Sequence, residues 1–151
     1  MVPRRYVVLL SGLTALFALR IAGQLVVAVF DVPFLPQFKD WYSGLVPYPM
    51  LLPVQILLLG LMLAIVRDIA RSRGFFATLT RRTGHILMRL SYLYAAAMAI
   101  RYALTMTLHP ELRWFTGTTP IWFHFVLASF LFTLGHFHAT RAERPDKGSV
   151  P

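Results

Sequence analysis

Four long runs of apolar residues follow one another along the chain, and the segments between them carry most of the charged residues. The runs cover about residues 6–30, 49–66, 86–108 and 120–138. A bilayer core about 30 Å thick is crossed by roughly 20 apolar residues in a helix, so each run is long enough to span it. The pattern therefore predicts an all-α integral membrane protein, built as a four-helix transmembrane bundle.

Little sequence remains outside these runs. We therefore expect one transmembrane domain over residues 1–140 and a short polar tail over residues 141–151. The first run follows two arginines, as in a signal peptide, but it continues to Phe30 without a small-residue cleavage pattern. It is therefore expected to be the first span rather than a removed leader.

The basic residues lie before the first run, between the second and third runs, and after the fourth. The other two connecting segments hold only Lys39 and Arg113, against Asp31, Asp40 and Glu111. Because Lys and Arg accumulate on the cytoplasmic side of membrane proteins, this alternation predicts that both termini are cytoplasmic. It favours the inner membrane of a bacterial-type cell and contact with anionic lipids, and it argues against nucleic acid as the partner.

Composition restricts the chemistry. The chain is 57% hydrophobic and 14% charged, and it has no cysteine, which excludes disulfides and thiolate nucleophiles. We find no Ser/His/Asp arrangement with a buried acid, no phosphate-binding glycine loop and no paired carboxylates. No acid lies inside an apolar run either, which argues against proton-driven transport. The sequence therefore favours a protein that is not an enzyme.

The segment between the first two runs is rich in proline and aromatic residues. Trp41, Tyr42 and Tyr48 are the amphipathic rings expected at the level of the lipid headgroups. This segment is interpreted as an external loop at the outer surface. An aromatic belt and a lid over the bundle both fit the pattern, and the belt is the more general device.

Polar side chains inside the runs are the main functional signal. Using 1.5 Å per residue, Arg20 lies about 15 Å below the outer end of its helix, and Gln55 and Arg101 about 10 Å below theirs. Gln24 lies one turn above Arg20 on nearly the same face. Since a charged side chain near the bilayer centre costs at least about 3 kcal/mol, these residues are expected to converge inside the bundle.

A polar stripe on the third run has the same implication. Its members recur at heptad-like spacing and are expected to face protein rather than lipid. They are Ser91, Tyr94, Met98, Arg101 and Thr105.

Three interpretations of the intramembrane arginines stay open. The first is a hydrogen-bonded link between helices, with Gln24, Gln55, Tyr94, or an acid from the outer loop such as Asp31 or Asp40, as partners. The second is a ligand site at Arg20, Gln24, Gln55, Tyr94 and Arg101 for an anion or a carbonyl oxygen, such as a lipid phosphate, a carboxylate, a quinone oxygen or a haem propionate. The third is contact with another protein chain.

The histidines raise haem as an alternative ligand. His124 and His138 lie fourteen positions apart, about 21 Å along one helix, a spacing similar to that in two-haem b-type cytochromes. Gly135 on that face is expected to leave room for a flat ring. His85 and His109 lie about 36 Å apart, so only one haem, at His109–His124 or at His85–His138, is compatible with the spacing.

Two functional hypotheses follow from these patterns. The first is a non-catalytic membrane protein, either a small accessory subunit or a binder of lipid or quinone, without a cofactor. The second is an electron carrier that binds haem b. Membrane lipids are the expected partners in the first case, together with other membrane subunits or further copies of the chain.

Overall fold

The computed structural model describes residues 3–30, 48–108 and 119–140, and every regular element in them is helical. In chain order these are α1 (Arg4–Phe30), α2 (Tyr48–Arg71), the short 3-10 helix η2 (Phe75–Ala77), α3 (Arg81–Leu108) and α4 (Thr119–Thr140). The prediction of an all-α chain with four long helices is confirmed. The proline-rich external segment, the outer connection after α3 and the polar tail lie outside the described residues.

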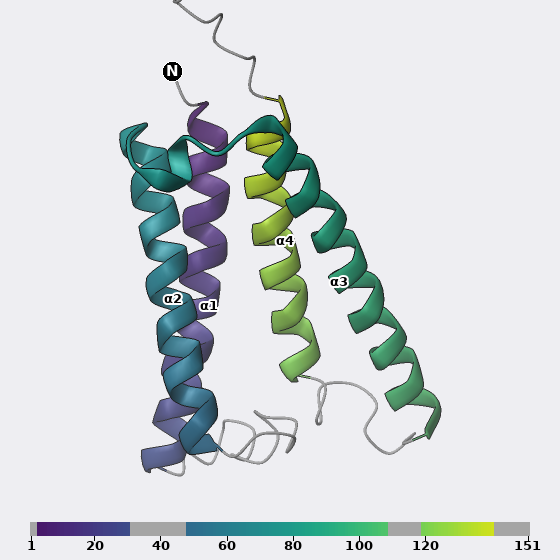
Figure 1. Cartoon of the computed structure of the whole chain (residues 1–151). Coiled ribbons are helices and arrows are strands. Elements are labelled where there is room, and N and C mark those ends of the chain that lie inside the picture. Colours follow the sequence, from purple (N-terminus) through teal and green to yellow (C-terminus); the bar gives the residue numbers. More distant parts are fainter. Residues whose placement is uncertain (1–2, 31–47, 109–118, 141–151) are drawn as a thin grey trace, which may run out of the picture.

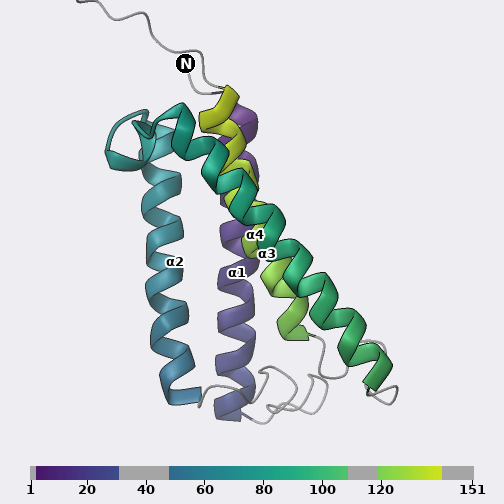
Figure 2. The same cartoon turned by 45° about the vertical axis from the view of Figure 1, so that its right-hand side comes forward.

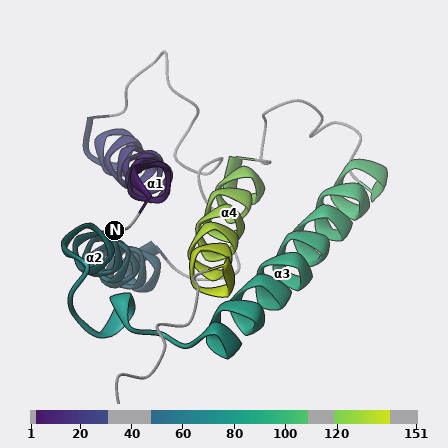
Figure 3. The same cartoon turned by 90° about the horizontal axis from the view of Figure 1, so that it is seen from above.

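Successive long helices run in opposite directions (Figure 1). The start of α1 and the end of α4 lie together, because the Tyr6 hydroxyl is 2.9 Å from Nδ1 of His136 and 3.4 Å from Oγ1 of Thr140. Seen from above, α4 lies between α3 on one side and the α1–α2 pair on the other (Figure 3). Helices α2 and α3 lie apart in the turned view as well and are joined by the segment that contains η2 (Figure 2).

Among the described residues, three helices are long and apolar enough to cross a membrane: Arg4–Phe30, Pro49–Arg71 and Ile121–Thr140. Helix α3 has 28 residues and is long enough, but it does not reach the same apolarity. Arg89 and Arg101 lower it, together with the serine and tyrosines of the same helix. The predicted spans are therefore supported for three helices, and α3 is the more polar exception.

The core is built by α1, α2 and α4. Its buried side chains recur at helical spacing, so that one face of each helix points inward. They are Tyr6, Leu10, Phe17, Ile21, Met62, Ile65, Ile69, Phe130, Leu134 and Phe137. Large apolar side chains elsewhere face outward, with Leu19 68% and Leu57 75% exposed. A protein in water rarely exposes so many, whereas lipid accommodates them.

Helix α3 lies at the periphery and touches α4 through glycine. A Cβ atom added to Gly84 would lie 2.5 Å from the backbone nitrogen of Ala139, and one added to Gly135 would lie 2.8 Å from the carbonyl oxygen of Gly84. Small residues allow this backbone approach. The space beside Gly135, expected from the sequence to admit a flat ring, is therefore filled by α3, which corrects that expectation.

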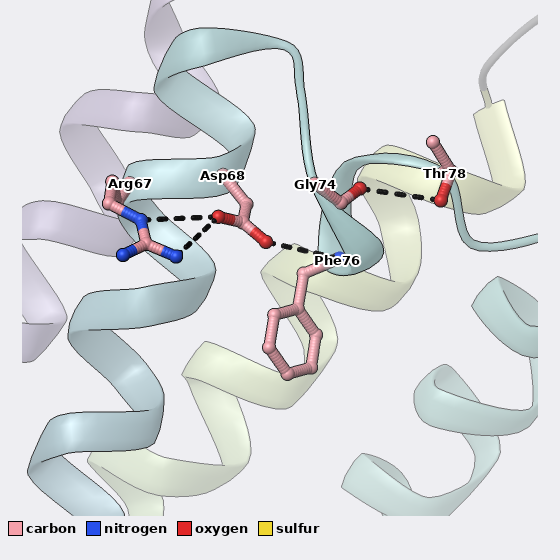
Figure 4. Close-up of polar contacts among 5 residues, drawn as sticks. All are labelled: Arg67, Asp68, Gly74, Phe76 and Thr78. Atoms are coloured by element: carbon pink, nitrogen blue, oxygen red, sulfur yellow. Dashed lines mark hydrogen bonds and ion pairs between the residues drawn. The ribbon is translucent and has the colours of Figure 1, made fainter.

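An acidic residue fixes the connection between α2 and α3, at the end of the bundle that the sequence predicts to be cytoplasmic, called the inner end (Figure 4). The buried Asp68 carboxylate accepts hydrogen bonds from Nη2 of Arg67 at 3.0 Å and from the backbone N–H of Phe76 at 3.4 Å. Gly74 has a φ of 103° and passes directly over this carboxylate. A positive φ and the lack of space both require glycine here. Asp68 thus holds η2 against the end of α2.

Candidate functional site

Two glutamines join α1 to α2 inside the bundle. Nε2 of Gln55 donates a hydrogen bond to Oε1 of Gln24 at 3.2 Å. Gln24 is 0% exposed and Gln55 is 4% exposed. This contact confirms that the two side chains lie at matching depth, as the spacing predicts.

Arg20 lies one helical turn from Gln24 and also points into the bundle. Only 8% of its surface is exposed. Its guanidinium carbon lies 5.0 Å from the centre of the Phe123 ring on α4, in a cation–π contact. The side chain therefore extends from α1 toward α4 rather than toward lipid.

Tyr94 on α3 and His124 on α4 contact each other near Arg20. The Tyr94 hydroxyl is hydrogen-bonded to Nδ1 of His124. Arg20 is close enough to act electrostatically on both residues. Arg101, which is half-buried, acts on His124 too. The two arginines thus act on the same histidine from different helices.

We name the residues Arg20, Gln24, Gln55, Tyr94, Arg101 and His124 the polar cluster. Four helices supply it, and it includes all five residues expected from the sequence to form the ligand site. His124 is the member that sequence reasoning missed in this role, since it was considered only as a haem ligand. Its contact with Tyr94 becomes evident only when the helices are packed.

The stripe on α3 behaves as expected. Ser91 is buried, and Tyr94, Met98, Arg101 and Thr105 are half-buried. The residues beside them face outward, with Leu93 69% and Ile100 61% exposed. The polar side of α3 therefore packs toward the bundle, which confirms the prediction.

The other histidines do not join the cluster. His85 is exposed at the inner end of α3, and His138 is buried near the end of α4. The α3–α4 backbone contact at Gly84 lies between them and leaves no gap for a porphyrin. His109 lies outside the described residues. No group of three possible metal ligands occurs in the described part of the chain.

Haem at His109–His124 therefore stays a prediction, and an absorption spectrum of the purified protein tests it. A Soret band that shifts on reduction is the expected signature of that alternative.

The glutamine pair is incompletely satisfied. Nε2 of Gln24 and Oε1 of Gln55 are buried, and neither has a hydrogen-bond partner within the described residues. Exchanging the oxygen and nitrogen positions of both amides leaves one donor and one acceptor unused in the same way. A buried polar atom without a partner costs about 1–3 kcal/mol. The pair thus presents a donor and an acceptor to any polar group that reaches it.

The polar cluster has net positive charge. Arg20 and Arg101 each contribute one positive charge. Asp68 is the acid present in the described segments, and it lies thirteen positions beyond Gln55 on α2, about 20 Å away along the axis. There it binds Arg67 and the backbone of η2. Asp31 and Asp40, expected as possible partners for the arginines, lie outside the described residues.

A groove continues from the polar cluster toward the inner end of the molecule. It has a volume of about 290 Å³ and lies between α2, α3 and α4. Tyr94 lines it and also belongs to the polar cluster. The other lining side chains are apolar and include Leu58, Leu61, Met62, Ile65, Leu127 and Leu131. Polar and apolar binding surfaces thus meet at Tyr94.

No protein-family model matches the chain, and neither a curated protein nor a solved structure is significantly similar to it. Function is therefore inferred from the site alone. The arrangement offers hydrogen-bond donors, positive charge and an adjoining apolar surface. Apolar lining with a few convergent polar groups is the general composition of a small-molecule binding pocket.

Proposed function

We propose that this protein is a non-catalytic, four-span protein of the inner membrane that binds an oxygen-bearing group of a membrane molecule. The bound group is an anion or a carbonyl, and it lies at the polar cluster in the outer half of the bilayer. Both termini are cytoplasmic in this proposal. The alternation of basic and acidic connecting segments supports that orientation.

The glutamine pair is the observation that carries the proposal. A hydrogen bond of 3.2 Å holds Gln24 and Gln55 together, yet one amide nitrogen and one carbonyl oxygen stay unused and buried. In hydrocarbon there is no water to satisfy such atoms. An oxygen atom of a ligand, placed against Nε2 of Gln24, removes the part of this cost that comes from the unused donor.

The arginines make the same position attractive for negative charge. An opposite charge in a low-dielectric interior interacts strongly with a guanidinium, and the planar fork of arginine binds two oxygens of a carboxylate or phosphate at once. Arg20 is supported by the Phe123 ring, which limits its freedom before a ligand binds. A preorganised donor of this kind loses little entropy on binding.

The proposal leaves the protein free to act as an accessory subunit that positions a lipid for other membrane proteins or for further copies of itself. Helix α3 exposes large apolar side chains such as Tyr92 and Leu93, which are 61% and 69% exposed. These are accommodated by lipid or by another transmembrane helix. Binding at the polar cluster does not depend on which neighbour covers them.

The test compares ligand occupancy in three variants of the polar cluster and one control variant. The protein is purified in a mild detergent, and co-purifying lipids are identified by native mass spectrometry. Arg20→Met and Gln24→Leu are expected to lose the bound molecule, and Arg20→Lys is expected to keep part of it, because lysine lacks the bidentate fork. Arg89→Met removes an exposed arginine on α3 and is the matched control.

Equal occupancy in Arg20→Met, Gln24→Leu and Arg89→Met contradicts the proposal. The polar cluster then only links the helices. Loss in Arg89→Met as well as in the cluster variants contradicts it too, because binding is then a property of general positive charge.

A further inference from the structure

We propose that the beginning of α3 carries a second binding site, for the headgroup of an anionic phospholipid at the inner end of the bundle. The site is an open hollow, which we name the basic hollow, and its lining residues are Arg81, Arg82, His85, Ile86 and Arg89. It shares no residue with the polar cluster. The proposal is therefore independent of the proposed function.

The basic side chains of the hollow lie on one side of α3. Gly84 faces α4, because a Cβ atom there would lie 2.5 Å from the backbone nitrogen of Ala139. At 3.6 residues per turn, the four basic residues point about 60–160° away from that direction. They are Arg81, Arg82, His85 and Arg89, and all four are exposed. The space they border has a volume of about 630 Å³, within the range of about 300 to 1,000 Å³ that is usual for ligand pockets.

The positive charge of the basic hollow does not depend on any single ion pair. Asp68, the acid of the described segments, is bound to Arg67 and to the backbone of η2. In the sequence, the segments that begin, turn or end at the inner end hold eleven Lys and Arg, against Asp68, Glu143 and Asp146. Glu143 and Asp146 together could neutralise only two of the three arginines of the hollow, and their own segment holds three basic residues. The other three acids of the chain, in the connections at the outer end, are Asp31, Asp40 and Glu111.

The stability of α3 alone does not explain these arginines. The first turn of a helix favours acids, because its free backbone N–H groups carry partial positive charge. Helix α3 has no acid in its first turn and begins with Arg81 and Arg82. Membrane topology requires basic residues in the connection, but it does not require them on one side of a helix. A phosphate group bound by both guanidinium groups accounts for the grouping.

The surface beside the basic hollow favours a lipid over a soluble anion. Ile86 lines the hollow and is 47% exposed. Leu93 and Ile100 follow Arg82 by eleven and eighteen residues, close to three and five whole turns, so they lie on the same face of α3. They are 69% and 61% exposed. A headgroup in the hollow therefore places its hydrocarbon chains along an apolar stripe of α3, whatever their number.

The experiment adds defined lipids to the full-length protein in a mild detergent and counts bound lipid by native mass spectrometry. Because the basic hollow is open, its lipid exchanges with detergent during purification and is added back for the measurement. It is therefore not counted among the molecules that co-purify at the polar cluster. Dioleoyl phosphatidylglycerol is expected to bind about tenfold more tightly than dioleoyl phosphatidylcholine, which has the same chains and a neutral headgroup. Glycerol 1-phosphate, which carries the phosphate without chains, should not displace it at equal concentration.

Paired substitutions locate the site. Arg81→Gln combined with Arg82→Gln is expected to weaken the binding of phosphatidylglycerol by about tenfold and to leave that of phosphatidylcholine unchanged. Arg71→Gln combined with Arg73→Gln is the matched control. It removes the same charge from two exposed arginines near the end of α2 and should keep the binding of phosphatidylglycerol. If the first pair lowers the helicity measured by circular dichroism, Arg82→Gln alone decides.

Each contrary result overturns the proposal. Equal binding of the two lipids shows that the hollow does not select an anionic headgroup, and displacement by glycerol 1-phosphate shows a site for a soluble anion. An equal loss in both paired variants shows that only the total charge of the inner end matters. Unchanged binding in the folded variant of Arg81 and Arg82 removes the site. Arg20→Met should keep the binding of added phosphatidylglycerol whether or not it loses the molecule at the polar cluster, so the two sites fail separately.

Discussion

At the residue scale, the unusual choice is a pair of glutamines where two apolar side chains would pack as well. Their mutual hydrogen bond at 3.2 Å uses only half of the amide atoms that face each other. Hydrogen bonds between membrane helices contribute about 0.6 kcal/mol on average, which does not offset a buried unpaired donor and acceptor. The pair is therefore better explained by binding than by stability of the empty protein.

If the glutamines serve binding, a variant that lacks both of them should keep its stability and lose its ligand. Gln24→Leu combined with Gln55→Leu should unfold at the same or a higher concentration of sodium dodecyl sulfate than the parent, because both unpaired atoms disappear together. The same variant should lose its lipid. Gln24→Leu alone should be destabilised by about 1–3 kcal/mol, since it leaves the Gln55 amide without a partner.

The single variants serve as the control for the double variant. If the double variant is less stable than either single variant, the glutamines are a structural link. The interpretation that the glutamines serve ligand binding rather than stability is then wrong.

At the element scale, α3 and α4 depend on two glycines that face each other. A methyl group at Gly84 would lie 2.5 Å from the Ala139 nitrogen and 2.8 Å from the Gly135 carbonyl oxygen, so the helices must move apart to admit it. Both neighbours are backbone atoms, which cannot turn aside as a flexible side chain can. The glycines thus set the distance between α3 and the rest of the molecule.

Gly84→Ala is therefore expected to lower the unfolding free energy by more than about 1 kcal/mol. Gly12→Ala and Gly60→Ala are matched controls, because a Cβ atom at either position meets no atom within 4 Å. In these controls the higher helix propensity of alanine should give no loss, or a gain approaching about 1 kcal/mol. The measurement is unfolding in sodium dodecyl sulfate, followed by circular dichroism. Equal stability of all three variants would show that the α3–α4 crossing relaxes freely.

The sequence predicts these elements well and their contacts less well. Apolar run length places four helices, and the heptad-like stripe on α3 identifies Tyr94 and Arg101 as inward-facing. Gly135, by contrast, is equally compatible with room for a ring and with close helix packing. The sequence leaves the choice open, because the choice depends on which residue of α3 lies opposite. The sequence does not predict the groove either, because the groove exists only where α2 and α3 do not pack against each other.

At the scale of the whole molecule, three helices form the core and the fourth is attached to it from one side. Helices α1, α2 and α4 supply all the residues of the core, while α3 buries only Gly84 and Ser91. The three helices that form the core are also the three that are apolar enough to cross a membrane, and α3 is less apolar. Of the two arginines in the middle of α3, Arg101 belongs to the polar cluster and is half-buried, whereas Arg89 is exposed.

The orientation of the whole molecule is testable with single cysteines, because the chain has none of its own. A cysteine at Arg71, at the end of α2, should be labelled by a membrane-impermeant maleimide only after the inner membrane is opened. A cysteine at Phe30, the last residue of α1, lies at the opposite end of the bundle from Arg71. It is the control and should react in intact cells. Labelling of the Arg71 variant in intact cells contradicts cytoplasmic termini.

The glycine contact between α3 and α4 has a mechanical consequence. It lies near the inner end of α3, and from there the two helices diverge toward the outer end (Figure 1). Arg101 is seventeen positions beyond Gly84, which is a lever arm of about 25 Å. A rotation of only about 5° around this fulcrum displaces the arginine by about 2 Å, while the backbone at the fulcrum hardly moves. Small changes at the inner end of α3 are thereby amplified at the outer end.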